Sequence, residues 1–389
     1  MYTKEQKQNF SKILKNITEE LDISDSKYEE AKRKYEGVGE WLNREGSVLV
    51  EYNPRIYTQG SFSLGTVVKP VNNNEGFDID LVCEIDHSKG SVTQKQLKEL
   101  VGGEINSYAK AKSINKPPEN KRRCWTLDYV NEFHMDILPA IPDSESLRLL
   151  LESKSLSAGW TECAISITDK TSHNYDYLDS EWLCSNPKGY AEWFKDKMKV
   201  VADSRKRELV LLEKYASVED VPMFEWKTPL QQAVQLLKRH RDIYFDGKDY
   251  KPISIIITTL SGHAYDNESD FYDAFSNIVN RLEDIVSLRQ NGVFQIPNPV
   301  NPTENFADKW NENEELPRAF NRWINQLKAD FDIIQQKQEL LSMQESLEPV
   351  LGAGVVADAF NKMLESQGSG KKYYPKVEIK SPSKPWGAS

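Results

Sequence analysis

Residues 1–45 carry apolar side chains at the spacing of an amphipathic helix. Between residues 10 and 17 these side chains recur every three or four positions, which places them on one helix face. The pattern resumes after a polar break at Ser24-Asp25-Ser26, where Ser24 or Asp25 can cap a second helix. We therefore expect helices throughout this segment. The apolar positions of the first helix are Phe10, Ile13, Leu14 and Ile17.

Near Asn53-Pro54 the pattern changes to short runs of strand-forming residues. Such runs, with helical stretches between some of them, are typical of a small mixed sheet with helices beside it. The segment 142–180 is polar and irregular, and we predict no regular element there. The expected strands lie at 55–59, 77–85, 124–130 and 134–140, and the expected helix lies at 93–111.

From about Pro187 the pattern is helical again, except where three prolines between 294 and 302 remove backbone donors. The fold class expected from these patterns is α+β, with a small sheet lobe and a helical lobe. The expected helices lie at 188–217, 229–245, 252–265, 269–290, 313–346 and 349–365. The expected domains are N-terminal helices that pack across the lobes (1–50), a catalytic lobe (51–185), a helical lobe (186–365) and a flexible tail (366–389).

The composition indicates a soluble globular protein. A chain of 389 residues suits two joined lobes better than one core. No apolar run approaches the ~18 residues that a membrane helix needs, and the polar N-terminus lacks a secretory signal, so we expect a cytoplasmic protein. The net charge of −10 argues against a protein that coats long nucleic acids. The cysteines form no C-x-x-C pair or zinc pattern, and we expect reduced, structural thiols.

The first candidate for chemistry is Gln59-Gly60-Ser61, directly after a predicted strand. Glycine lets the backbone approach a phosphate closely, and the serine hydroxyl with neighbouring amides can hold phosphate oxygens. Taken alone, a Gly-Ser pair is also a common turn.

A pair of acids follows in Phe77-Asp78-Ile79-Asp80-Leu81. Residues two apart on a strand point to the same face, so Asp78 and Asp80 present their carboxylates side by side. Two adjacent carboxylates repel unless a cation lies between them, and hard oxygen ligands suit magnesium or manganese. The alternative is a solvated strand face, against which the scarcity of aspartate in strands argues.

A third acid, Asp136, interrupts an apolar run at 133–139. A lone aspartate in such a strand is costly without a partner. If this strand lies beside the run at 77–85, Asp136 completes a two-metal site. If it does not, a hydrogen-bonded structural aspartate is the alternative.

The order of these elements resembles that of the polymerase β-like nucleotidyltransferases: Gly60-Ser61 on a turn, Asp78 and Asp80 on the next strand, and Asp136 on a later strand. Further stretches resemble the bacterial CD-NTases, the anti-phage signalling cyclases related to oligoadenylate synthetase and cyclic GMP-AMP synthase. The resemblance covers roughly residues 50–310. The stretches that carry it are 186–194, 229–242, 252–260 and 298–305.

The resemblance implies a bilobal enzyme in which Asp78, Asp80 and Asp136 are catalytic and hold two Mg²⁺ ions, with Mn²⁺ as the alternative. It also implies that Gln59, Gly60 and Ser61 hold the nucleotide triphosphate. Lys238 and Ser254 are implied to grip the β- and γ-phosphates. Pro252 suits the first turn of a helix and would place Ser254 near an N-terminus that favours anions.

Other basic residues near these positions are weaker candidates. For Lys238 itself, a solvated helix face is the alternative, and we expect Arg239 and Arg241 to lie on other sides of the same helix. The run Lys121-Arg122-Arg123 can touch product phosphates or can simply be surface. His134 is expected to pack beside the metal site, because neutral imidazole is not a preferred magnesium ligand.

The activity that the resemblance implies is synthesis of a cyclic di- or trinucleotide second messenger from ATP, alone or with GTP or another nucleoside triphosphate. The product would act on a downstream effector in anti-phage defence, and no membrane or long nucleic acid would be needed. Two alternatives stay open: a linear product or nucleotide addition to RNA or another acceptor, and an inactive nucleotide-binding scaffold. In related systems a ubiquitin-transfer-like partner conjugates the cyclase through its C-terminus, here Pro385-Trp386-Gly387-Ala388-Ser389. A plain tail is the alternative.

Overall fold

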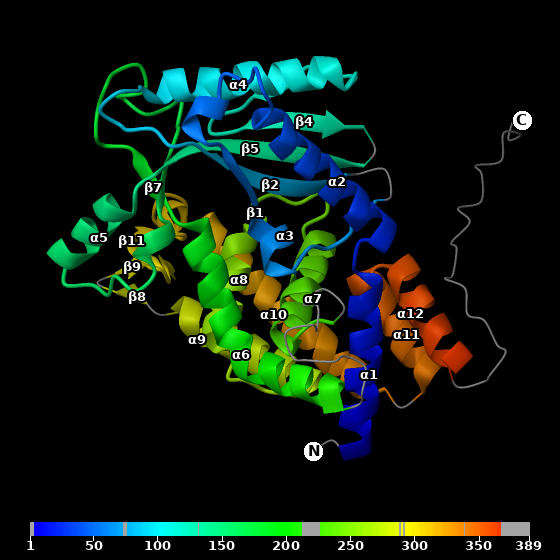
Figure 1. Cartoon of the computed structure of the whole chain (residues 1–389). Coiled ribbons are helices and arrows are strands. Elements are labelled where there is room, and N and C mark those ends of the chain that lie inside the picture. The colour runs from blue at the N-terminus through cyan, green and yellow to red at the C-terminus, as the bar shows by residue number, and fades with distance from the viewer. Residues whose placement is uncertain are drawn as a thin grey trace, which may run out of the picture.

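The computed structural model of the protein describes residues 4–72, 76–130, 132–211, 226–287, 289–290, 292–337 and 339–366. Within them a seven-stranded mixed sheet lies above a group of helices (Figure 1). Its central path runs β1-β2-β5-β4-β3, and β6 joins β5 to β7. The strands of this sheet are β1 (Arg55–Gln59), β2 (Phe77–Glu84), β3 (Glu119–Asn120), β4 (Trp125–Tyr129), β5 (Phe133–Pro142), β6 (Ile165–Ile167) and β7 (Leu183–Ser185).

Helices make up most of the remainder. The α-helices are α1 (Lys4–Glu20), α2 (Asp25–Leu42), α3 (Gly60–Leu64), α4 (Gln94–Ala111), α5 (Ser144–Ser153), α6 (Pro187–Leu211), α7 (Pro229–Tyr244), α8 (Ser254–Ala264), α9 (Phe271–Ser287), α10 (Glu315–Gln335), α11 (Leu340–Leu351) and α12 (Ala353–Ser366). Short elements complete the chain: η1 (Val50–Tyr52), η2 (Thr161–Cys163), β8 (Arg289–Gln290), β9 (Val293–Phe294), β10 (Pro297–Asn298), β11 (Asn301–Asn305) and η3 (Asp308–Asn311).

One face of the sheet is apolar and is covered by α2 and α4. Alternate residues of β2 and β5, including Ile79, Leu81 and Met135, are fully buried in a shared core with these helices. Because side chains alternate across a strand, the residues between them point to the opposite face. There the aspartates of β2 and β5 lie toward one end, and Val82 and Leu138 form a small apolar cluster further along. The acids therefore face away from α2 and α4.

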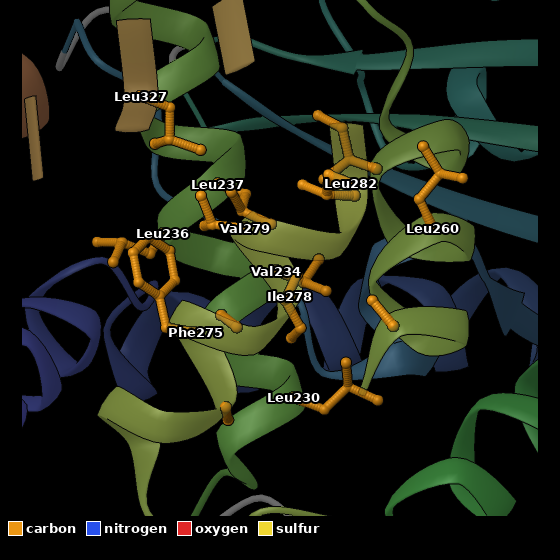
Figure 2. Packing of buried hydrophobic residues seen from close by; sticks show 14 of the residues in the cluster. Leu230, Val234, Leu236, Leu237, Leu260, Phe275, Ile278, Val279, Leu282 and Leu327 are labelled. Carbon is orange, nitrogen blue, oxygen red and sulfur yellow. The ribbon is translucent and has the colours of Figure 1, made fainter. Parts of the chain in front are cut away.

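The second core belongs to the helical lobe. Figure 2 shows its centre, where apolar side chains of α7, α8, α9 and α10 meet. Helix α7 is buried along almost its entire length, and a Thr228–Gln231 capping box begins it. The labelled members of this core are Leu230, Val234, Leu236, Leu237, Leu260, Phe275, Ile278, Val279, Leu282 and Leu327.

Three expectations about elements are wrong. The predicted helix over 313–346 is two helices, because the chain ends α10 at Gln335 and begins α11 at Leu340, which lets α11 pack back against α7 and α10. The segment 142–180 is not irregular, since it contains α5 and the sheet strand β6. Pro252 does not lie in the first turn of a helix, because α8 begins at Ser254. Of the expected tail over 366–389, Ser366 ends α12, and the remainder lies outside the described residues.

Candidate active site

The three aspartates are brought together by strand register. Strand β2 pairs in parallel with β5, which sets Asp80 directly opposite Asp136 and Asp78 opposite His134. Strand β1 pairs antiparallel with β2 on its other edge, which sets Gln59 opposite Asp80. Directly opposite residues of neighbouring strands share a face. The predicted acids thus occupy one face of adjacent strands, next to the end of β1.

The corner after β1 is closed against one of these acids. Gly60 has a φ of +60°, a conformation that strains other residues, and it begins the short helix α3. A Cβ atom added there would lie 2.5 Å from Oδ2 of Asp80. A side chain at position 60 would therefore collide with the carboxylate, and only glycine leaves room for it.

The acids perturb one another. Burial, as the largest cause, and the charges of Asp136 and Asp78 together raise the pKa of Asp80 to about 6. Burial and the charge of Asp136 also raise the pKa of Asp78. The positive charges of Lys238 and Lys121 act in the opposite direction and lower the pKa of Asp80. Neighbouring carboxylates that resist ionisation are characteristic of a place where a cation is needed.

Asp136 has two partners on the neighbouring hairpin. The hydroxyl of Thr126, its register neighbour on β4, donates to Oδ1 of Asp136. The Lys121 ammonium donates to the same oxygen over 3.4 Å. Burial acts against the charged form of Lys121, but Asp136 raises its pKa above the ordinary value, so Lys121 is a cation at neutral pH. Lys121 is thus part of the site.

The helical lobe supplies the other wall. A cavity of about 550 Å³ lies between the sheet and α7, and Ser61, Asp78, Lys238, Arg241 and Ser254 are among its lining residues. A larger cavity of about 960 Å³ adjoins α3 between α2 and α6, but none of the three aspartates lines it. Asp78 is the member of the triad that lines the smaller cavity, whose lining joins both lobes, and we therefore take the smaller cavity as the candidate site.

Lys238 lines this cavity, and it does not lie on a solvated helix face, which was the alternative that the sequence left open. Its side chain is 5% exposed, and Nζ donates to the backbone oxygen of Thr66 over 3.0 Å and to Oγ1 of Thr66 over 3.1 Å. Burial, together with the charge of Arg241, lowers the pKa of Lys238 to about 7. A buried lysine whose hydrogen-bond partners are neutral can form an ion pair with a bound anion.

Arg241 is a residue that the sequence interpretation placed wrongly. It follows Lys238 by three positions and so lies on the same helix face, whereas Arg239 does not line the cavity. The Arg241 guanidinium donates to Oγ of Ser254 over 2.9 Å. Because arginine cannot accept, the serine oxygen is the acceptor, and the Ser254 hydroxyl hydrogen stays available for a second partner.

The three basic residues at 121–123 contact two different carboxylates. Arg122 and Arg123 both bond the carboxylate of Asp169, whereas Lys121 contacts Asp136. His134 lies beside the acids and pairs with Asp128 over 3.4 Å, next to the site as expected. The sequence offered no signal for Thr126, because only strand pairing brings it to Asp136.

The donor set suits a hard divalent cation, since all three acids offer carboxylate oxygens. The side chains are nevertheless not gathered into a finished ligand set. Within the described part of the chain, no group of three or more His, Cys, Asp and Glu residues is arranged to hold a metal ion as it stands. The carboxylates would have to turn inward, away from partners such as Lys121, to share a cation.

Comparison with known proteins identifies the same region of the chain. Residues 54–139 match the family model for the nucleotidyltransferase domain of cyclic GMP-AMP synthase DncV-like proteins. A c-di-GMP synthase from Roseivirga ehrenbergii is 32% identical over 372 residues, which cover 94% of this chain and 89% of that protein.

Solved structures of similar proteins share the fold. The CD-NTase CdnG of Bradyrhizobium diazoefficiens, in complex with GTP, superposes with a TM-score of 0.67 at 21% identity, over 91% of this chain and 99% of that chain. Escherichia coli MS115-1 CdnC with ATP gives a TM-score of 0.57 at 15% identity, over 88% of this chain and 96% of that chain. Among the described helices, none is long and apolar enough to cross a bilayer.

Proposed function

The chain belongs to the bacterial CD-NTases, the DncV-like nucleotidyltransferases, and we propose that it condenses two nucleoside triphosphates into a cyclic dinucleotide at the cavity between the sheet and α7. One observation carries the proposal. Asp80 and Asp136 lie opposite each other on parallel strands, next to the Gly60 corner, and Asp78 on the same face of β2 lines the cavity together with Lys238. This arrangement supports a site with the acids on one wall and the phosphate-binding groups on the other.

The triphosphate of the donor nucleotide would bind between the two lobes. Ser61, which lines the cavity in α3, would offer its hydroxyl, and Gln59 and Gly60 directly before it would bring the backbone close. From the other wall, the Lys238 ammonium supplies a positive charge and Ser254 supplies a hydroxyl that Arg241 orients. The α-phosphorus of the donor would then face the acids of β2 and β5.

Asp78, Asp80 and Asp136 would hold two Mg²⁺ ions, or Mn²⁺ in their place. Bound metal lowers the pKa of the acceptor ribose hydroxyl and screens the pyrophosphate that leaves. The protein's own share is positioning and charge neutralisation, which dominate phosphoryl-group transfer. We also propose that Asp136 accepts the proton of the acceptor hydroxyl.

GTP is the first substrate to test. The similar protein from Roseivirga ehrenbergii is named a c-di-GMP synthase, and the CdnG structure contains GTP. ATP, which the sequence interpretation favoured, is the second substrate to test, since the CdnC structure contains it. A cyclic dinucleotide is accordingly favoured over a trinucleotide.

The test is product analysis. The purified protein is incubated with each ribonucleotide and with their mixtures, with Mg²⁺ and with Mn²⁺, and the products are identified by chromatography and mass spectrometry after phosphatase treatment. A phosphatase-resistant dinucleotide that disappears in Asp80→Asn and in Asp136→Asn supports the proposal. Unchanged product in those variants would contradict the site assignment.

The same assay separates the alternatives. A ladder of phosphatase-sensitive oligomers would identify a linear product, made by the same residues. No product under any condition, together with nucleotide binding, would identify an inactive scaffold. Three acids on one face of two strands argue against the scaffold, because their mutual repulsion serves nothing in simple nucleotide binding.

We further propose that the product is a signal to an effector in anti-phage defence, and that the protein acts in the cytoplasm. This rests on membership of the family. A phage challenge of cells that carry the natural operon, with the wild-type gene or with Asp80→Asn, tests it: protection by the wild type alone is expected, and equal protection would contradict it. Conjugation through Pro385–Ser389 remains a proposal that concerns residues outside those described. Mass spectrometry of the C-terminal peptide tests it.

A further inference from the structure

Helix α4 holds the turn between β3 and β4 in place. Lys98 of α4 is 0% exposed, and its ammonium donates to the backbone oxygens of Arg122 and Cys124 over 3.2 and 3.4 Å. The backbone amide of Lys121 donates to the oxygen of Cys124 over 3.1 Å and closes the turn. The backbone that carries Lys121 is therefore held in place.

The two arginines of the turn are also engaged. Arg122 and Arg123 direct their Nε atoms to the two carboxylate oxygens of Asp169, over 2.8 and 2.9 Å. Asp169 in turn is fixed by Gln94, whose Oε1 accepts from its backbone amide over 2.8 Å. Of the three neighbouring cations, Lys121 alone is directed at Asp136.

The Lys121 ammonium influences all three acids. It contacts Oδ1 of Asp136, and its charge is among the causes that favour the ionised forms of Asp78 and Asp80. The Oδ1 atom that it contacts also accepts from the Thr126 hydroxyl. A divalent cation shared by Asp80 and Asp136 needs lone pairs of these same carboxylates and would be repelled by an ammonium so close.

We propose that Lys121 is an internal counter-ion of Asp136 that weakens metal binding to the nucleotide-free protein, so that the divalent cations enter together with the triphosphate. This inference rests on the proposed function, because it presumes that the three aspartates are metal ligands.

The coupling follows from the ligands available. Without nucleotide, a cation must displace the ammonium from Asp136 and gains only protein carboxylates. With nucleotide, the phosphate oxygens supply further ligands, and their negative charge offers Lys121 another partner. The nucleotide-free enzyme would thereby bind divalent cations only weakly until a triphosphate is present.

The test is a Mn²⁺ titration of the full chain without nucleotide, followed by electron paramagnetic resonance. Removal of the ammonium in Lys121→Met should lower the Kd for Mn²⁺ at least threefold, whereas Lys121→Arg, which keeps the charge, should leave it unchanged. With a nonhydrolysable GTP analogue present, the difference between Lys121→Met and wild type should fall below twofold. Lys121→Gln is the second neutral variant, should Lys121→Met not fold.

Lys116→Met is the matched control. Lys116 lies in the loop before β3 and pairs with Asp128 of β4 over 2.5 Å, so this variant removes the same charge from a carboxylate outside the triad. It should leave the Kd for Mn²⁺ within twofold of the wild type. An equal effect of both substitutions, or an unchanged or higher Kd in Lys121→Met, would overturn the role of Lys121.

Failure of the proposed function gives a different result. If Asp136→Asn binds Mn²⁺ with the same Kd as the wild type, the aspartates are not the metal ligands and both proposals are wrong. The same conclusion follows if the wild type binds no Mn²⁺ with or without nucleotide. If Asp136→Asn abolishes binding while Lys121→Met changes nothing, only the inference on Lys121 is wrong.

Discussion

Gly60 shows how one residue can determine whether the acids can act. Its φ of +60° and the separation of 2.5 Å between an added Cβ and Oδ2 of Asp80 are two distinct constraints. The backbone constraint concerns stability, since a non-glycine residue at positive φ costs about 1 kcal/mol. The steric constraint concerns chemistry, because it displaces a carboxylate of the proposed metal site.

Gly60→Ala should therefore lower kcat at least tenfold while the free energy of unfolding changes by only about 1 kcal/mol. The measurements are steady-state turnover with GTP and denaturant unfolding. Gly46→Ala is the control, because Gly46 also has positive φ, +84°, but its added Cβ meets nothing within 4 Å. Equal activity losses in the two variants would show that strain, and not contact with Asp80, is responsible.

If Lys238 binds the triphosphate as proposed, nucleotide binding should depend on pH. The pKa of Lys238 is lowered to about 7 by burial, so the side chain is an ammonium below pH 7 and is largely neutral above it. A bound triphosphate favours the ammonium, and binding above pH 7 must take up a proton. The affinity should consequently fall as the pH rises through and above 7.

We expect the Kd for a nonhydrolysable GTP analogue to rise roughly tenfold between pH 6.5 and pH 8.5, because each pH unit above the pKa of a required proton costs up to about tenfold. Calorimetry in buffers of different ionisation enthalpy should show proton uptake at the higher pH. Lys238→Met should bind more weakly and without this pH dependence. A variant that keeps the full dependence would assign it to another group.

At the scale of elements, α7 is the support of the helical wall, since it carries both Lys238 and Arg241. Its N-terminus is closed by Thr228 and Gln231, each of which bonds the backbone amide of the other, and Thr228 is fully buried. Further along, His240 accepts from Nε1 of Trp323 on α10 over 3.0 Å. The helix is thus held at its start and near its end.

Thr228→Val keeps the shape of the side chain but removes the capping oxygen. We expect it to lower the free energy of unfolding by about 1 kcal/mol, the usual cost of losing such a cap, while Thr228→Ser changes it little. Urea unfolding followed by tryptophan fluorescence measures both. A valine variant as stable as the wild type would mean that the backbone amides at the start of α7 find other partners.

Sequence periodicity predicted elements of this kind well, because strands and amphipathic helices reveal themselves locally. Strand β2 was expected at 77–85 and is observed as Phe77–Glu84. The sequence predicted that Asp136 would join the other two acids if their strands pair, and the register that sets it opposite Asp80 came from the structure. The break between α10 and α11 carries no proline or glycine, and β6 and β7 exist through pairing with distant residues. Local patterns contain no record of such packing, and for the same reason they missed the burial of Lys238 and its partnership with Thr66.

At the scale of the whole molecule, the site depends on two cores that the chain builds in an interleaved order. The sheet core takes in α2 and α4, while the helical core takes in α1 from the beginning of the chain and α12 from its end. Figure 1 shows α1 beside α12, and α1 also contacts α7 and α9. The first helix is therefore part of the wall that carries Lys238, although it lies far from that residue in sequence.

Leu14 tests this dependence. Its side chain on α1 is 0% exposed within the helical core, so Leu14→Ala should lower the free energy of unfolding by about 3 kcal/mol through lost burial and the cavity left behind. Val200→Ala on α6 is the control, since Val200 is 65% exposed and should change the free energy by less than about 0.5 kcal/mol. Because Leu14 does not line the cavity, the folded variant should keep the KM of the wild type at low temperature and lose nucleotide binding at the denaturant concentration where its helices melt. If Leu14→Ala proved as stable as Val200→Ala, or if nucleotide binding persisted after the helices had unfolded, α1 would not support the helical wall that carries Lys238.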